Sequence, residues 1–266
     1  MESFMKYQIT RILTDRKKAA MLAILLLLPS IEVFQILYDS LANKLELPYP
    51  LYATFLSLYS RGHVFQSLYL WFMPLYLLVI IGEDSVEDYS TGYKNVLMCR
   101  IGRSAYIKNK LKSGFLMPFA TIVCGLLLNL ILIQIVCQGG THLKFDGEYM
   151  VYDAGTMPGT MLFKWSYTHP LLANLGYIFI TALFCGMIGM AGVMFVIVLH
   201  DRKIVYALTF ALWFFPVLLK NSFMLIFQPF SEYGLLTLLP LGMWILGLYV
   251  LILILLLVWE VKFVEI

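Results

Sequence analysis

Charged residues are scarce in this sequence. Asp, Glu, Lys and Arg make up only 13% of its 266 residues, whereas 61% are hydrophobic and the mean hydropathy is +0.83. A water-soluble domain of this length cannot bury so much apolar surface, but a protein with several membrane spans leaves that surface facing lipid. The composition therefore excludes a soluble domain and indicates a polytopic membrane protein.

The sequence also lacks the motifs of common catalytic and cofactor sites. It contains no GxxxxGK[ST] phosphate-binding loop, no HExxH zinc motif, no GxSxG turn and no glycine-rich dinucleotide fingerprint. Its cysteines show neither metal-site spacing nor a disulfide framework. They are Cys99, Cys124, Cys137 and Cys185. We predict that the chain is not an enzyme, binds no cofactor or metal of its own, and hydrolyses no ATP alone. An intramembrane enzyme would need a catalytic constellation that the sequence does not show.

No cleavable signal peptide is expected. The first apolar run, 19–38, is too long for a signal sequence, and no small-residue cleavage site follows it. We predict an all-α integral membrane protein with one transmembrane domain over 1–266, in which this run is the first of six spans. The predicted spans are about 19–38, 64–82, 113–137, 170–199, 204–219 and 235–259.

Two further segments are expected at the membrane without crossing it. Apolar residues between Met5 and Leu13 recur on one helical face, which predicts an N-terminal interfacial helix; a disordered basic tail is the alternative. The segment 222–230 is apolar but too short to cross, which predicts a re-entrant or interfacial segment between the fifth and sixth spans. Pro74 predicts a kink in the second span.

The longest charged segment is 83–112, between the second and third predicted spans. Four acids come first, a turn signal ends at Gly92, and six bases follow. A charged hairpin cannot lie in lipid, so we expect this segment to be exposed to water and to form the contact surface for another protein.

The bases are distributed unevenly between the predicted sides of the membrane. With six spans, 14 of the 19 Lys and Arg residues fall in the N-terminal segment, 83–112, 200–203 and the C-terminal tail, which share one side. Cytoplasmic segments carry an excess of Lys and Arg. Both termini and the charged segment are therefore predicted to be cytoplasmic.

Two features inside the spans are candidate sites. Glu32 is an acid in the first span, where an ionisable group is costly and often functional. It is a candidate for a substrate path, and an acid satisfied by polar neighbours is the alternative. Small residues recur at helical spacing in the fourth span and would allow close helix packing, either within the subunit or against a second one. They are Cys185, Gly186, Gly189 and Gly192.

The charged segment carries a family resemblance. Asp88 stands four residues before Gly92, an apolar helix follows, and Arg103, Tyr106 and Lys110 lead into the third span. This pattern resembles the signature between the second and third spans of bacterial ABC-2-type transporter permeases. The whole layout is also similar to that family. Glu is more common than Asp at the first position, a departure that leaves the substrate open.

The resemblance implies a permease subunit of an ABC exporter of the drug-export or bacteriocin/lantibiotic-immunity type, in a bacterial cell membrane. Separate cytoplasmic ATPase subunits would bind ATP and Mg²⁺, and the permease would form a homodimer or pair with a related permease. The cargo would be a peptide, a drug or another amphipathic molecule. The implied coupling residues are Glu83, Asp84, Glu87, Asp88, Gly92, Arg103 and Lys110. The alternative is a non-transporting anchor or sensor that docks a soluble partner; membrane lipid is expected as a contact, and nucleic acid is not.

Overall fold

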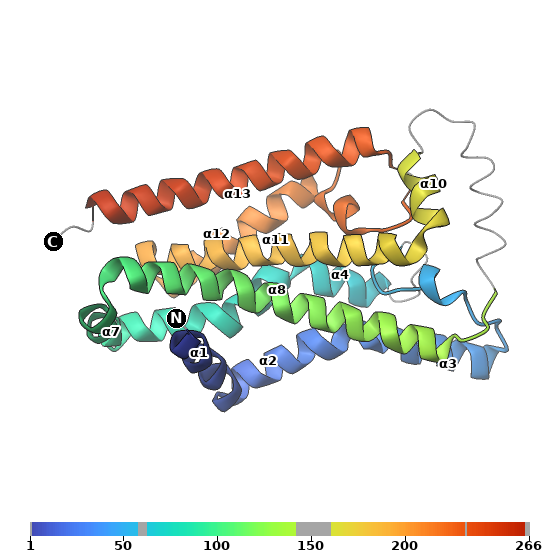
Figure 1. The fold of residues 1–266 in the computed structure, drawn as a ribbon, viewed down its shortest axis with the longest axis horizontal. Helices are drawn as coiled ribbons and strands as arrows, with labels where there is room; N and C mark the ends of the chain where they lie inside the picture. The colour runs from blue at the N-terminus through green and yellow to red at the C-terminus, as the bar shows by residue number, and fades with distance from the viewer. Residues whose placement is uncertain (1, 58–62, 142–160, 232, 264–266) are drawn as a thin grey trace.

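A computed structural model describes residues 2–57, 63–141, 161–231 and 233–263. Every regular element in these ranges is helical, and most helices run along one long axis (Figure 1). The longer elements are α1 (Glu2–Thr14), α2 (Arg16–Leu27), α3 (Ile31–Asn43), α4 (His63–Trp71), α5 (Met73–Leu77), α6 (Glu83–Ser90), α7 (Tyr93–Ile101), α8 (Arg103–Val136), α10 (Met161–Thr168), α11 (Pro170–Leu199), α12 (Arg202–Phe214) and α13 (Leu235–Phe263).

Within the described residues, four helical stretches are long and apolar enough to cross a membrane. A fifth candidate is the pair His63–Trp71 and Met73–Ser90, whose two parts are bent by 57°. The predicted all-α class is therefore found, and the apolar helices indicate a membrane protein. The four stretches are Arg16–Asn43, Arg103–Val136, Pro170–Leu199 and Leu235–Glu260.

The predicted fifth span, 204–219, does not form a helix of spanning length. α12 has 13 residues, or about 20 Å of helix, against a hydrocarbon core of about 30 Å. It continues into the short 3₁₀-helix η4 (Phe215–Leu218). The segment predicted to be re-entrant contains a second 3₁₀-helix, η5 (Phe223–Phe227), in which Phe223 and Phe227 are fully buried.

The charged segment 83–112 is not the exposed hairpin that we predicted. α6 continues the bent second span through the short π-helix η3 (Leu78–Gly82), and α8 begins at Arg103, ten residues before the predicted third span. Within this segment, the turn at Gly92 and the helix α7 lie at the end of the bundle (Figure 1). We call this the α7 end and the opposite one the α10 end.

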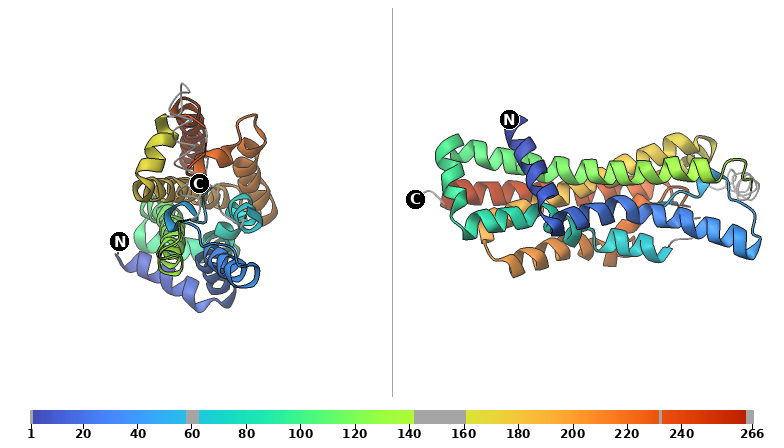
Figure 2. Two further views of the ribbon diagram at one scale, coloured as in Figure 1. Left: turned by 90° about the vertical axis from the view of Figure 1, so that its right-hand side faces the viewer. Right: turned by 90° about the horizontal axis from the view of Figure 1, so that it is seen from below.

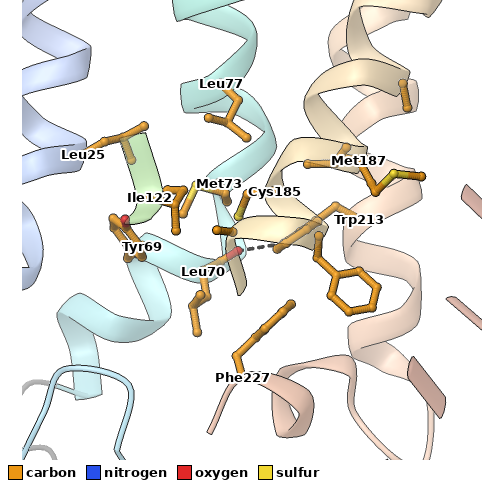
Figure 3. Close-up of a cluster of buried hydrophobic side chains, with 14 of the residues drawn as sticks. Leu25, Tyr69, Leu70, Met73, Leu77, Ile122, Cys185, Met187, Trp213 and Phe227 are labelled. Carbon is orange, nitrogen blue, oxygen red and sulfur yellow. Dashed lines mark hydrogen bonds between the residues drawn. The ribbon is translucent and has the colours of Figure 1, made fainter. Parts of the chain in front are cut away.

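The bend in the second span has a local cause. Pro74 has no backbone N–H, so the carbonyl of Leu70 loses its helical partner. The indole Nε1 of Trp213, from α12, donates a hydrogen bond of 2.7 Å to that carbonyl, as Figure 3 shows. Trp213 is fully buried, so α12 both covers the bend and satisfies its freed carbonyl. The predicted kink at Pro74 is thus present.

The small residues of α11 face other helices of the same chain. A Cβ at Gly189 would lie 2.5 Å from the carbonyl oxygen of Gly114, and one at Gly186 would lie 2.7 Å from the ring of Phe115. Gly192 approaches Leu78 of η3 in the same way, and Cys185 is fully buried. These residues therefore allow α11 to pack closely against α8 and η3.

At the α10 end, part of the predicted loop 39–63 is folded into the bundle. Residues 52–57 are buried, and the side-chain amides of two spans hold this segment. Asn129 accepts a hydrogen bond from the backbone N–H of Phe55 at 3.0 Å and donates to the Pro29 carbonyl at 2.8 Å. Asn174 accepts from the hydroxyl of Thr54 at 2.8 Å. Most of the other predicted loop, 138–169, lies outside the described residues.

Candidate functional site

The candidate site is a cluster of ion pairs around α6 at the α7 end. Asp84 and Asp88 are four residues apart and therefore share one helical face. Both are buried, with 0% and 1% of their surface exposed. A buried carboxylate must be paired with a base or a hydrogen-bond donor, and other helices supply the bases.

Arg11 of α1 binds three of the α6 acids. Its Nε lies 2.8 Å from Asp84, its Nη1 2.5 Å from Asp88 and its Nη2 2.8 Å from Glu87. A planar guanidinium can serve several carboxylates at once. Burial opposes the charge of Arg11, but the hydrogen bond that Arg11 donates to Asp88 and the attraction of Asp84 and Asp88 outweigh it and raise the pKa of the guanidinium.

Two lysines complete the buried part of the cluster. Lys110 of α8 donates to Asp88 at 2.8 Å, and each of these side chains is 1% exposed. Lys18 of α2 donates to Asp84. The three acids Asp84, Glu87 and Asp88 thus meet three bases, and Lys18 also lies 3.3 Å from the Asp15 carboxylate. We expected Lys110 to lie at the surface of the charged segment, and its burial corrects that expectation.

The fourth acid of α6 points toward another helix. Glu83 lies 2.6 Å from Arg202 and accepts a hydrogen bond of 2.6 Å from the hydroxyl of Tyr206, both on α12. The four acids therefore connect α6 to α1, α2, α8 and α12. α1 crosses the bundle at this point, as the right-hand view in Figure 2 shows.

α7 is different from its neighbours because none of its residues is buried. Gly92 and Gly102 flank it with φ angles of 71° and 82°, which favour glycine. Its exposed residues include Val96, Cys99 and Arg100. The helix is held between two glycine turns, one face of it is only half-buried, and its other face lies exposed at this end of the molecule.

Two contacts beside α7 join α8 to α13 and the α11–α12 turn to α6. Arg103, at the start of α8, donates to the backbone carbonyl of Glu260 on α13 at 2.6 Å and lies 3.2 Å from its carboxylate. His200, in the α11–α12 turn, stacks on Tyr89 with ring centroids 3.8 Å apart. Burial first, and then Lys94, lower the pKa of His200.

Glu32 does not belong to this cluster. It is buried in the first turn of α3, directly after the break at Pro29. One of its carboxylate oxygens, Oε2, is buried without a hydrogen-bond partner in the part of the chain that the structure describes. Among the described residues no group of His, Cys, Asp and Glu is arranged to hold a metal ion. The ion pairs of the α6 cluster hold neighbouring helices together.

Sequence reasoning missed the bases on α1 and α2 and the partners on α12 and α13. Arg11 and Lys18 were counted only as topology determinants, and Arg202, Tyr206 and Glu260 were not singled out. The available signal was the sequence of α6 itself, since acids at i and i+4 beside a membrane span require counter-charges from elsewhere.

Comparison with known proteins finds a relative over nearly the full chain. No family model matches the chain, and no solved structure matches it. The chain is 31% identical over 261 residues to "Uncharacterized protein YybM" of Bacillus subtilis (strain 168), and the match covers 98% of this chain and 100% of that protein. At this identity and coverage, the chain belongs to the same protein family as YybM.

Proposed function

We propose that the protein is the membrane-spanning permease subunit of an ATP-driven exporter and that a separate ATPase docks at the α7 end. The chain would cross the membrane six times, with α12, η4 and η5 forming the short fifth crossing and its return. Both termini and α7 would be cytoplasmic. The cargo class implied by the resemblance is a peptide, a drug or another amphipathic molecule.

The observation that carries the proposal is the combination of α7 and α6. α7 has no buried residue, whereas the adjoining α6 is bonded to four other helices. A partner that binds α7 would therefore act on α1, α2, α8 and α12 through one helix. Coupling of this kind requires two arrangements of the helices that the partner favours differently.

The packed interior supports a cargo path that runs between two subunits and not through one. Trp213, Phe223 and Tyr249 are fully buried in one cluster with Phe227, and Tyr52 stacks on Tyr167 at the α10 end with ring centroids 4.5 Å apart. Aromatic side chains thus fill these two parts of the interior. Under the proposal, cargo passes between two permease subunits, either two copies of this chain or this chain and a related one.

The same packed interior favours a second candidate, a membrane anchor or sensor that docks a soluble partner without transport. Both candidates use the surface of α7. They differ in the partner, because only the exporter requires a nucleotide-hydrolysing subunit whose turnover depends on this chain.

The experiment is ATPase measurement on the complex purified by a tag on this chain. The exporter predicts a co-purifying P-loop protein and ATP turnover that falls at least tenfold in Val96→Asp/Arg100→Glu, two changes on the exposed surface of α7. Glu46→Lys, at the α10 end, is the matched control and should leave turnover unchanged. A partner without ATP turnover would support the anchor or sensor, and equal turnover in both variants would refute docking on α7.

A further inference from the structure

A hollow of about 450 Å³ lies between the start of α8 and the end of α13 at the α7 end. Its volume is in the range of small-molecule sites, which measure about 300–1,000 Å³. Its walls combine two bases with an apolar floor. The residues that line it are Arg103, Ser104, Ile107, Lys108, Leu111, Leu257 and Glu260.

The length of α8 indicates where the hollow lies across the membrane. Its 34 residues make a helix of about 51 Å, about 20 Å more than the hydrocarbon core of a bilayer. The continuous apolar part begins near Ser113, so the turns from Arg103 to Lys112 extend beyond the hydrocarbon. The hollow therefore lies where lipid headgroups meet the acyl chains.

The basic residues line one end of the hollow and the apolar residues the other, which is complementary to an amphipathic ligand. Lys108 is exposed, and the side chain of Arg103 keeps 33% of its surface accessible although it contacts Glu260. Ile107 and Leu111 lie one and two turns from Arg103 toward the membrane centre, and Leu257 faces them from α13. One end of a ligand would meet positive charge and the other a hydrocarbon surface.

We propose that this hollow binds a phospholipid with an anionic headgroup. Lys108 and Arg103 contact the phosphate, and an acyl chain lies along Leu111 and Leu257. The charges favour an anionic lipid: Arg103 and Lys108, with Lys94 nearby, outnumber Glu260, and a phosphate with an uncharged glycerol headgroup offsets this positive charge. Zwitterionic phosphatidylcholine brings an additional trimethylammonium group, for which the hollow has no aromatic cage.

The site also connects lipid binding to the position of α13. The Arg103–Glu260 contact joins α8 to the end of α13, and a phosphate would share the guanidinium of Arg103 with the Glu260 carboxylate. Bound lipid would therefore bridge the two helices at a place where they have few direct contacts. This inference does not depend on the proposed export function.

The test is lipid binding to the purified protein in neutral detergent, followed by native mass spectrometry. Phosphatidylglycerol is compared with phosphatidylcholine of identical acyl chains, and with glycerol phosphate as the free headgroup. We expect phosphatidylglycerol to bind at least fivefold more tightly than phosphatidylcholine, and glycerol phosphate not to compete. Lys108→Gln should remove most of this preference, whereas Lys203→Gln, an exposed base of α12 at the same end, should leave it unchanged.

A second variant tests the apolar part of the hollow. Leu257→Trp fills the floor without changing the charge and should weaken phosphatidylglycerol binding at least threefold. If Lys108→Gln and Lys203→Gln reduce the preference for phosphatidylglycerol equally, the lipid responds only to the overall charge of the protein. Full competition by glycerol phosphate would mean that a soluble phosphate occupies the hollow. Either result would overturn the lipid site.

Discussion

The indole N–H of Trp213 donates to the Leu70 carbonyl at 2.7 Å, and this carbonyl is the group that Pro74 leaves without a helical partner. The relation joins α12 to the bend of the second span. It explains how a proline is accommodated inside a buried helix without an unsatisfied polar group.

This bond predicts a coupling between the two side chains. Trp213→Phe should destabilise the protein by about 1–3 kcal/mol, because the buried carbonyl of Leu70 loses its donor. Pro74→Ala restores a backbone N–H at residue 74, so the same Trp213→Phe change should cost less in that background. Thermal unfolding of the four proteins in one detergent measures the cycle. Additive effects would show that the Trp213 bond does not compensate for Pro74.

The buried pair of Asp88 and Lys110 predicts an asymmetric effect of mutation. Lys110→Met leaves the Asp88 carboxylate with Arg11 alone and should cost about 3–5 kcal/mol of folding free energy. Lys110→Met combined with Asp88→Leu should cost less than the sum of the two single changes. Glu87→Gln is the control on the same helix: its acid is 60% exposed, so its loss should cost at most about 1 kcal/mol.

If Lys110→Met and Glu87→Gln have equal effects on the unfolding temperature, the Asp88–Lys110 pair is not buried in the folded protein. The comparison therefore tests the arrangement of α6 against α8 directly, independently of any transport activity.

The contact between α8 and α11 predicts different outcomes for two glycines of the same helix. Gly189→Ala places a Cβ 2.5 Å from the Gly114 carbonyl oxygen, so the two helices must separate; we expect a loss of about 1–3 kcal/mol. A Cβ at Gly176 has no atom within 4 Å, and Ala is favoured over Gly inside a helix by about 0.5–1 kcal/mol. Gly176→Ala should therefore be neutral or stabilising. Unchanged stability in Gly189→Ala would contradict the close contact, and a loss in Gly176→Ala would contradict the open space at that position.

His200 predicts a dependence of stability on pH. Burial and Lys94 lower its pKa in the folded protein below the ordinary 6.5, while Glu260 opposes the shift. The unfolded chain therefore takes up a proton more readily. The stability contribution is fully present above pH 6.5 and is lost as the pH falls through the folded pKa. Thermal unfolding between pH 7.5 and pH 5 should show a smaller decline in His200→Gln than in the wild type; identical declines would exclude His200 as the cause.

Much of the fold could be predicted because long apolar runs specify membrane helices directly. The run 170–199 coincides with α11, and Pro74 and Gly92 indicated the bend and the turn that the structure has. The polar contacts could not be predicted in this way. Arg11 and Asp88 are 77 residues apart, and Lys110 has the same local sequence features as an exposed lysine beside a span.

The same limit applies to the ends of helices. The lysines before residue 113 led to the prediction that the third span begins at Ser113. The helix α8 instead begins at Arg103, because Asp88 compensates the charge of Lys110 and allows the charged turns to pack. The predicted fifth span, 204–219, has only 16 residues, which is short for a bilayer crossing. Its actual structure, a helix followed by two 3₁₀ segments, depends on aromatic packing among Trp213, Phe223 and Phe227, which no local pattern encodes.

The exposed Cys99 on α7 provides a probe for the docking of an ATPase on this helix. The chain would carry Cys99 alone, with Cys124, Cys137 and Cys185 changed to Ala, and a thiol-linked photo-crosslinker would be activated in native membranes. A control chain would carry its single cysteine at position 46, at the α10 end, through Glu46→Cys. Docking on α7 predicts a crosslink from Cys99 to a protein with a GxxxxGK[ST] motif and none from the control. Folded protein that gives no such adduct from Cys99, or the same adduct from both positions, would contradict it.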